Sequence, residues 1–166
     1  LEWGDVAAGS MTLLSTTTLS GSSTTISSIS GSYKNLMLTA TGINLSADAH
    51  IRIAPNAETN KTGLVGLDSY LSTIQSTAVN DYIYWGGYTQ KSANTANQFT
   101  IYFNDYTSTT NKTLFGQRGY FAATPIEYSI QNASWYYLSS AAITSLVFSP
   151  STGTFSAGTV KLYGVN

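Results

Sequence analysis

The stretch that decides the fold class is residues 36–41, Leu-Met-Leu-Thr-Ala-Thr. Positions 36, 38 and 40 share one face of an extended chain, because successive side chains of a β-strand point to opposite sides. Residues 99–104, Phe-Thr-Ile-Tyr-Phe-Asn, repeat the pattern at positions 99, 101 and 103. Both stretches are therefore predicted to be strands with one buried face.

Outward from these two stretches, the same period of two continues along the chain. It predicts weaker strands at 11–17, 24–29, 50–54, 82–86, 112–121, 143–149 and 159–163. Segments rich in Gly, Pro, Asn and Ser separate them, and no stretch of eleven or more residues has a clean helical period. About nine short strands without helices predict an all-β fold, an antiparallel β-sandwich of jelly-roll-like type.

Two longer segments, 55–77 and 88–98, fit this scheme poorly. Because long loops are uncommon in compact domains, residues 64–74 are expected to hold an extra strand or a short helix. The length of 166 residues predicts one domain over 1–166. Since the sequence begins with Leu1, we expect this domain to be excised from, or joined to, a longer N-terminal region.

The composition predicts a neutral surface. Charged residues make up 9% of the chain, while serine and threonine together reach about 28%. The seven Lys and Arg residues are scattered singly, so nucleic acid binding is disfavoured. No apolar run approaches the ~18 residues that would cross a bilayer, so no membrane insertion is expected. The absence of cysteine excludes disulfide scaffolds and thiolate metal sites.

Catalytic residues are scarce in this sequence. The single histidine, His50, shares a predicted strand face with Arg52, a like-signed neighbour. We therefore predict no enzymatic activity, no cofactor and no metal site. A polysaccharide hydrolase is the weaker alternative, because a glycosidase needs only two acids about 5 to 9 Å apart. Its candidate acids fall at predicted turns or strand ends: Asp48, Glu58, Asp68, Asp81, Asp105 and Glu127.

The aromatic residues supply the candidate binding sites. Tyr82, Tyr102 and Tyr106 fall opposite apolar positions of predicted strands, so we expect their rings to point outward at a subunit interface. A second group, Tyr84, Trp85 and Tyr88, flanks the Gly86-Gly87 pair and is the candidate ligand site of a carbohydrate-binding module. The high strand propensity of tyrosine is the competing explanation for all of these positions.

The C-terminal residues 155–165, Phe-Ser-Ala-Gly-Thr-Val-Lys-Leu-Tyr-Gly-Val, resemble the closing strand of jelly-roll domains in structural proteins of tailed bacteriophages. In that family a Phe-x-Ala-Gly-Ser/Thr turn leads into a strand that ends in Leu-Tyr-Gly. Further segments match in the same order: 11–17, 32–36, 99–106, 113–120 and 143–148. The sequence departs at 54–58, Ala-Pro-Asn-Ala-Glu, where relatives usually carry an Asn-Gly-Asp-like turn.

The resemblance implies a component of the virion exterior, such as a tail fibre, head fibre or capsid-decoration protein. Such proteins are usually homotrimers with no catalytic residues to transfer. The expected partners are sister subunits, other virion proteins and a host-surface glycan. Two roles stay open. Receptor binding predicts that 55–77 and 88–98 cluster at one exposed end, whereas capsid cementing predicts that the tyrosine-bearing faces are buried against other subunits.

Overall fold

A computed structural model describes residues 11–59, 61–68, 73–80, 82–83, 97–123 and 126–166. In order, these residues form the strands β1 (Met11–Thr18), β2 (Thr24–Ile26), β3 (Asn35–Leu45), β4 (Ile51–Pro55), β5 (Thr62–Asp68), β6 (Thr73–Asn80), β7 (Asn97–Phe103), β8 (Lys112–Ala123), β9 (Ile126–Tyr137), β10 (Leu146–Pro150) and β11 (Phe155–Val165). Within these ranges the chain contains no helix, and hence none that is long and apolar enough to span a membrane. The prediction of an all-β fold is confirmed.

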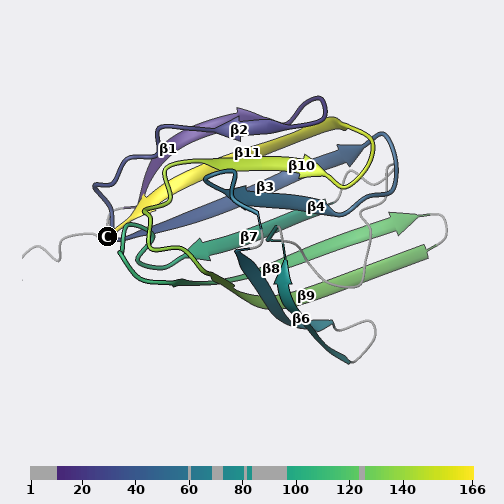
Figure 1. Ribbon diagram of the computed structural model, residues 1–166. Coiled ribbons are helices and arrows are strands. Elements are labelled where there is room, and N and C mark those ends of the chain that lie inside the picture. Colours follow the sequence, from purple (N-terminus) through teal and green to yellow (C-terminus); the bar gives the residue numbers. More distant parts are fainter. Residues whose placement is uncertain (1–10, 60, 69–72, 81, 84–96, 124–125) are drawn as a thin grey trace, which may run out of the picture.

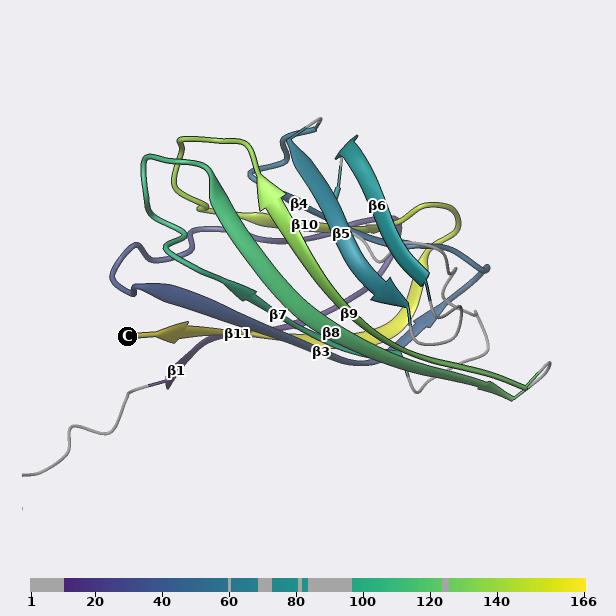
Figure 2. The same ribbon diagram turned by 90° about the horizontal axis from the view of Figure 1, so that it is seen from below.

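Two antiparallel sheets make up the sandwich (Figure 1). The larger has the order β1-β11-β3-β7-β8-β9-β5-β6, and the smaller has the order β2-β10-β4. The smaller sheet covers only one part of the larger one, and β8 and β9 extend beyond it (Figure 2).

The two ends of the chain are interleaved in both sheets. β11 lies between β1 and β3 in the larger sheet, and β10 lies between β2 and β4 in the smaller one. Among the first four strands, β1 and β3 lie in the larger sheet and β2 and β4 in the smaller one. Of the last two strands, β10 lies in the smaller sheet and β11 in the larger one. An isolated bridge between Ile53 and Ile83 brings one further segment to the free edge of β4.

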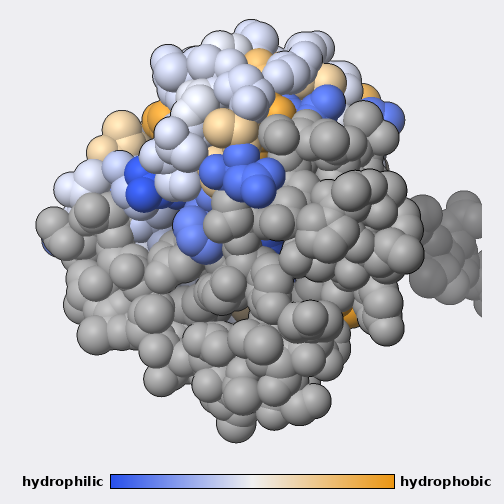
Figure 3. All heavy atoms as spheres, turned by 90° about the vertical axis from the view of Figure 1, so that its right-hand side faces the viewer, coloured by the Kyte–Doolittle hydropathy of each residue, from blue (hydrophilic) through white to orange (hydrophobic). Residues whose placement is uncertain are grey.

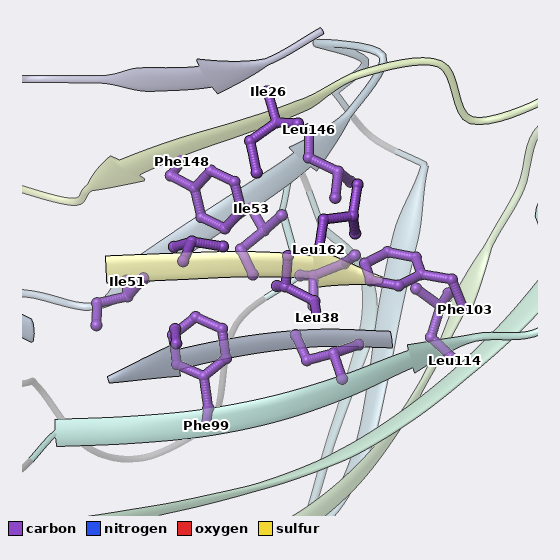
Figure 4. Close-up of a cluster of buried hydrophobic side chains, with 14 of the residues drawn as sticks. Ile26, Leu38, Ile51, Ile53, Phe99, Phe103, Leu114, Leu146, Phe148 and Leu162 are labelled. Atoms are coloured by element: carbon purple, nitrogen blue, oxygen red, sulfur yellow. The ribbon is translucent and has the colours of Figure 1, made fainter. Parts of the chain in front are cut away.

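The core lies between the two sheets (Figure 4). Alternate residues of β3 and β7 point into it, because side chains of a strand face opposite sides in turn. The smaller sheet contributes Ile26, Ile53, Leu146 and Phe148, which are all buried. The predicted inward faces of residues 36–40 and 99–103 are therefore confirmed, since Leu36, Leu38, Ala40, Phe99, Ile101 and Phe103 are buried.

Three strands lie where the sequence predicted none or left the choice open. β5 and β6 occupy most of the 55–77 segment, so the extra element expected at 64–74 is strand and not helix. β9 was missed because both of its faces mix polar and apolar residues, although Ala133, Trp135 and Tyr137 are buried on the inward side. Ile130 is 62% exposed, whereas the neighbouring Gln131 is buried.

The predicted outward orientation of Tyr106 is wrong. β7 ends at Phe103 and the chain turns through Asp105, whose φ is 45°, so the alternation of the strand does not reach residue 106. The ring is fully buried, and its hydroxyl donates a hydrogen bond to the backbone carbonyl of Ser30. Burial raises the pKa of the Tyr106 phenol. This side chain joins core segments, and it offers no surface to a second subunit.

Candidate functional site

An apolar ladder crosses the outward face of the larger sheet. It comprises Leu13, Tyr163, Met37, Tyr102 and Phe115, one residue from each of β1, β11, β3, β7 and β8. Each residue is the direct cross-strand partner of the next, and such pairs are the units that stabilise a sheet surface. The ladder ends on β9, where Phe115 is paired with Ser134.

This outward face gathers the exposed apolar side chains. The large hydrophobic residues that stand out on the described surface are Met11, Leu13, Phe115 and Ile130, between 46% and 62% exposed, and all four lie on it. The strands β1, β11, β3, β7, β8 and β9 are neighbours in the larger sheet. Among their described outward residues, Lys161 is the one charged side chain. Such depletion of charge is typical of the centre of protein interfaces.

Residues of intermediate hydropathy dominate the described part of one side of the molecule (Figure 3). On the side drawn in Figure 3, the described residues are mostly pale, with smaller blue and orange groups. Pale colours are those of residues with hydropathy near zero, such as serine and threonine. Phe115, 46% exposed, is one of the four large hydrophobic residues exposed on the described surface.

Tyr102 covers only one side of Phe115. The two rings are stacked, with centroids 4.7 Å apart and planes inclined by 12°. On the other side the paired residue is Ser134, whose small side chain covers little of the Phe115 ring. A cavity of about 360 Å³ opens there, and Asn104, Thr113 and Tyr136 also line it. We call this cavity the Phe115 slot.

Gly63 of β5 keeps the Phe115 slot open on the side that faces β5. Tyr136 is the cross-strand partner of Gly63 on β5, and its ring occupies the space where a side chain at residue 63 would stand. The ring therefore leans toward β5 and away from β8. With alanine at position 63, the ring would have to move.

A second groove lies further along the same face. It has a volume of about 450 Å³, and its lining includes Thr39, Gln98, Thr100, Gln117 and Ile130. Gln117 follows Phe115 by two residues on the outward side of β8, so the groove continues the line of the Phe115 slot. These five side chains are uncharged, and four of them carry amide or hydroxyl groups. Arg118 also lines the groove, but it is buried and its Nε donates a hydrogen bond to Oε1 of Gln131.

A polar cluster lies where the first residue of β8, Lys112, pairs with the last residue of β9, Tyr137. The Tyr137 hydroxyl donates a hydrogen bond to Oε2 of Glu58, and Nδ2 of Asn56 lies 3.4 Å from the same hydroxyl. Lys112 Nζ donates to the carbonyl oxygens of Thr110 at 3.0 Å and Ser139 at 2.9 Å. It lies 5.7 Å from the Tyr137 ring centroid, within cation–π range.

Burial sets the titration of this cluster. It raises the pKa of Tyr137 to about 12, an effect that the hydrogen bond to Glu58 increases. Burial also lowers the pKa of Lys112, against the opposing charge of Glu58. Glu58, one of the candidate acids, thus accepts a hydrogen bond in a structural cluster that ties the β4–β5 connection to β9.

The structure places the predicted aromatic residues differently. Tyr102 lies on the outward face, half-buried in the apolar ladder, as predicted. Tyr82 is half-buried, with Cζ of Arg52 4.8 Å from its ring centroid. Whether either ring meets a second subunit stays a prediction. The candidate ligand residues Tyr84, Trp85 and Tyr88 lie outside the described residues.

Sequence reasoning missed the residues around the Phe115 slot. One available signal was Phe115 itself, which stands between Thr113 and Gln117 on the polar side of the predicted strand 112–121. Within the described ranges, no group of three or more His, Cys, Asp or Glu residues could hold a metal ion.

The comparisons with known proteins leave the function to be argued from this chain's own residues. No protein-family model matches the sequence, and no curated protein matches it. Among solved structures, the CspB protease of Clostridium perfringens aligns with 94% of this chain at 9% identity, with a TM-score of 0.26. The chain spans 25% of that protease.

Proposed function

We propose that this chain is a jelly-roll module of a bacteriophage virion protein, displayed on the virion exterior and assembled as a homotrimer. The observation that carries the proposal is the outward face of the larger sheet, where the apolar ladder crosses five strands almost without charge. Contact with sister subunits or other virion proteins over the β1, β11 and β3 part of this face would remove Leu13, Tyr163 and Met37 from water.

The strand order supports the jelly-roll part of the proposal. A jelly roll pairs strands of the first half of the chain with strands of the second half across two sheets. In this chain β10 and β11 insert between β2 and β4 and between β1 and β3. The strands β8, β9, β5 and β6 then extend the larger sheet beyond this interleaved part.

The assembly is tested by light scattering on the purified chain. At micromolar concentration we expect a mass of three times the 17.7 kDa of one chain. The variant Leu13→Asp should shift the mass toward the monomer, because it places an unpaired charge in the apolar ladder. Thr25→Asp, at an exposed position of the smaller sheet, is the matched control and should leave the trimer intact. A monomeric wild-type chain, or a trimeric Leu13→Asp variant, would contradict the proposal.

The virion role needs its own experiment. Gold-labelled antibody raised against this domain should bind intact phage particles, on the capsid for a decoration or head-fibre protein and on the tail for a tail-fibre protein. Particles that bind no antibody, while purified protein does, would count against display on the exterior.

A further inference from the structure

The Phe115 slot has the chemistry of a saccharide site. We propose that it binds one residue of a neutral polysaccharide, which stacks its apolar face on the Phe115 ring. This inference deepens the attachment role expected of a virion exterior protein, and it rests on the proposed function only for the source of the saccharide.

One face of the Phe115 ring is uncovered. Tyr102 stacks on one side of Phe115, and Ser134 leaves the other side open to the slot. An uncovered ring face attracts an apolar surface of similar size, and a sugar ring presents such a surface through its C–H groups. The cavity of about 360 Å³ lies within the range of about 300–1,000 Å³ typical of small-molecule sites.

The polar groups around the ring suit hydroxyl partners. Thr113 and Ser134 are exposed, and Asn104 is half-buried, so amide and hydroxyl groups border the ring. Tyr136 closes the side toward β5. Neutral donors and acceptors placed around one aromatic face can bind the hydroxyls of a sugar and fix its orientation.

Charge decides the class of saccharide. No Lys, Arg, Asp or Glu side chain lines the slot, and the second groove presents the neutral side chains of Thr39, Gln98, Thr100 and Gln117 along the same face. The one charged residue in the lining of the second groove is Arg118, which is only 4% exposed and whose Nε donates a hydrogen bond to Oε1 of Gln131. A sulfated or uronic acid polymer, like a nucleic acid, would be recognised by clustered cations. The second groove begins at Gln117, two residues beyond Phe115 on β8, and offers room for neighbouring sugar residues of a chain.

The slot and the proposed interface use different parts of the face. The ladder residues Leu13, Tyr163 and Met37 belong to β1, β11 and β3, whereas the slot lies over β8 and β9. Tyr102 separates the two regions. A trimer built through the β1 side therefore leaves the slot open to a ligand.

Affinity electrophoresis tests the inference on the full chain. Native gels contain dextran, galactomannan, xylan or hydroxyethyl cellulose as neutral probes, and alginate as the acidic probe. We expect at least one neutral polymer to retard the wild-type protein, and alginate to leave its mobility unchanged. Phe115→Ala should weaken that retardation by about tenfold in Kd, because the stacking surface is lost.

Two further variants separate a binding role from a general effect on the fold. Ser134→Leu should block the slot, because the larger side chain fills its floor. Gly63→Ala removes no ligand contact, but it should weaken retardation because the added methyl group displaces the Tyr136 ring. Val147→Ala, which trims a half-buried residue of the smaller sheet, is the control and should bind as wild type does. Circular dichroism verifies that each variant is folded.

The results also distinguish this inference from the proposed assembly. Retardation that depends on Phe115 in a chain that is monomeric by light scattering supports the slot and removes the trimer. The inference is overturned if no neutral polymer retards the wild-type chain, if folded Phe115→Ala binds as tightly as wild type, or if alginate retards the chain as strongly as the neutral polymers.

Discussion

Replacing Gly116 with alanine is expected to lower the free energy of unfolding by about 3 kcal/mol, the upper end of the range for overpacking a core. Gly116 lies on the buried side of β8, paired with Ile101 of β7. A methyl group at this position would fall well inside van der Waals contact of the Thr100 carbonyl oxygen, and 3.2 Å from both Cα and Cγ1 of Ile101. Because two of these atoms belong to the backbone of β7, the strands would have to separate to make room.

Gly31→Ala is the matched control for this prediction. Gly31 is exposed, and the nearest heavy atom to an added methyl group would be Cγ2 of Thr107 at 3.8 Å, which is ordinary contact. Urea unfolding followed by circular dichroism, at one fixed protein concentration, measures both variants. If Gly116→Ala proves as stable as Gly31→Ala, the result would contradict the close approach of β7 to β8 at Gly116.

The strands that could be predicted are those whose pattern and burial agree. In residues 36–40 of β3 and 99–103 of β7 every second residue is apolar and buried, so the period of two in the sequence matches the observed burial. β9 breaks this relation. Its buried side includes Gln131, while Ile130 on the opposite side lies near the second groove. A strand that buries a polar residue on its inward face and exposes a large apolar residue on its outward face is not recognised from periodicity alone.

The candidate site was only partly predictable for a related reason. The outward position of Tyr102 follows from the alternation of its strand, but Tyr106 lies beyond the strand end, where a turn changes the direction of the side chain. The Phe115 slot depends on which residues are paired across strands far apart in sequence. Gly63, Phe115 and Ser134 become neighbours only through the order β8-β9-β5, which the pattern of a single strand does not contain.

The stability of the fold is expected to fall steeply between about pH 10 and pH 12, chiefly through Tyr137. The unfolded phenol titrates near pH 10, whereas burial and the hydrogen bond to Glu58 raise the folded pKa to about 12. A group whose folded pKa is raised stabilises the fold fully below its unfolded pKa, and this contribution is lost as the pH rises through the folded pKa. A shift of two units corresponds to at most about 2.7 kcal/mol.

The other shifted groups modify this profile in known directions. Tyr106, whose pKa is also raised by burial, adds to the loss at alkaline pH. Lys112 acts in the opposite sense. Its folded pKa is lowered, so the energetic penalty of burying its charge disappears as the pH approaches the unfolded value of about 10.5. We therefore expect a shallow rise in stability up to about pH 10, followed by the steep fall.

Tyr137→Phe isolates the contribution of the phenol. At pH 7 it should lower the free energy of unfolding by about 1–2 kcal/mol, because the half-buried Glu58 carboxylate loses its donor. Above pH 10 the variant should lose stability less steeply than the wild-type chain, so the difference between the two narrows. Tyr136→Phe, at the neighbouring outward position, is the control and should keep the wild-type slope. Urea unfolding at pH 7, 9, 10 and 11 measures both variants, and wild-type and Tyr137→Phe curves that stay parallel over this range would refute the assignment.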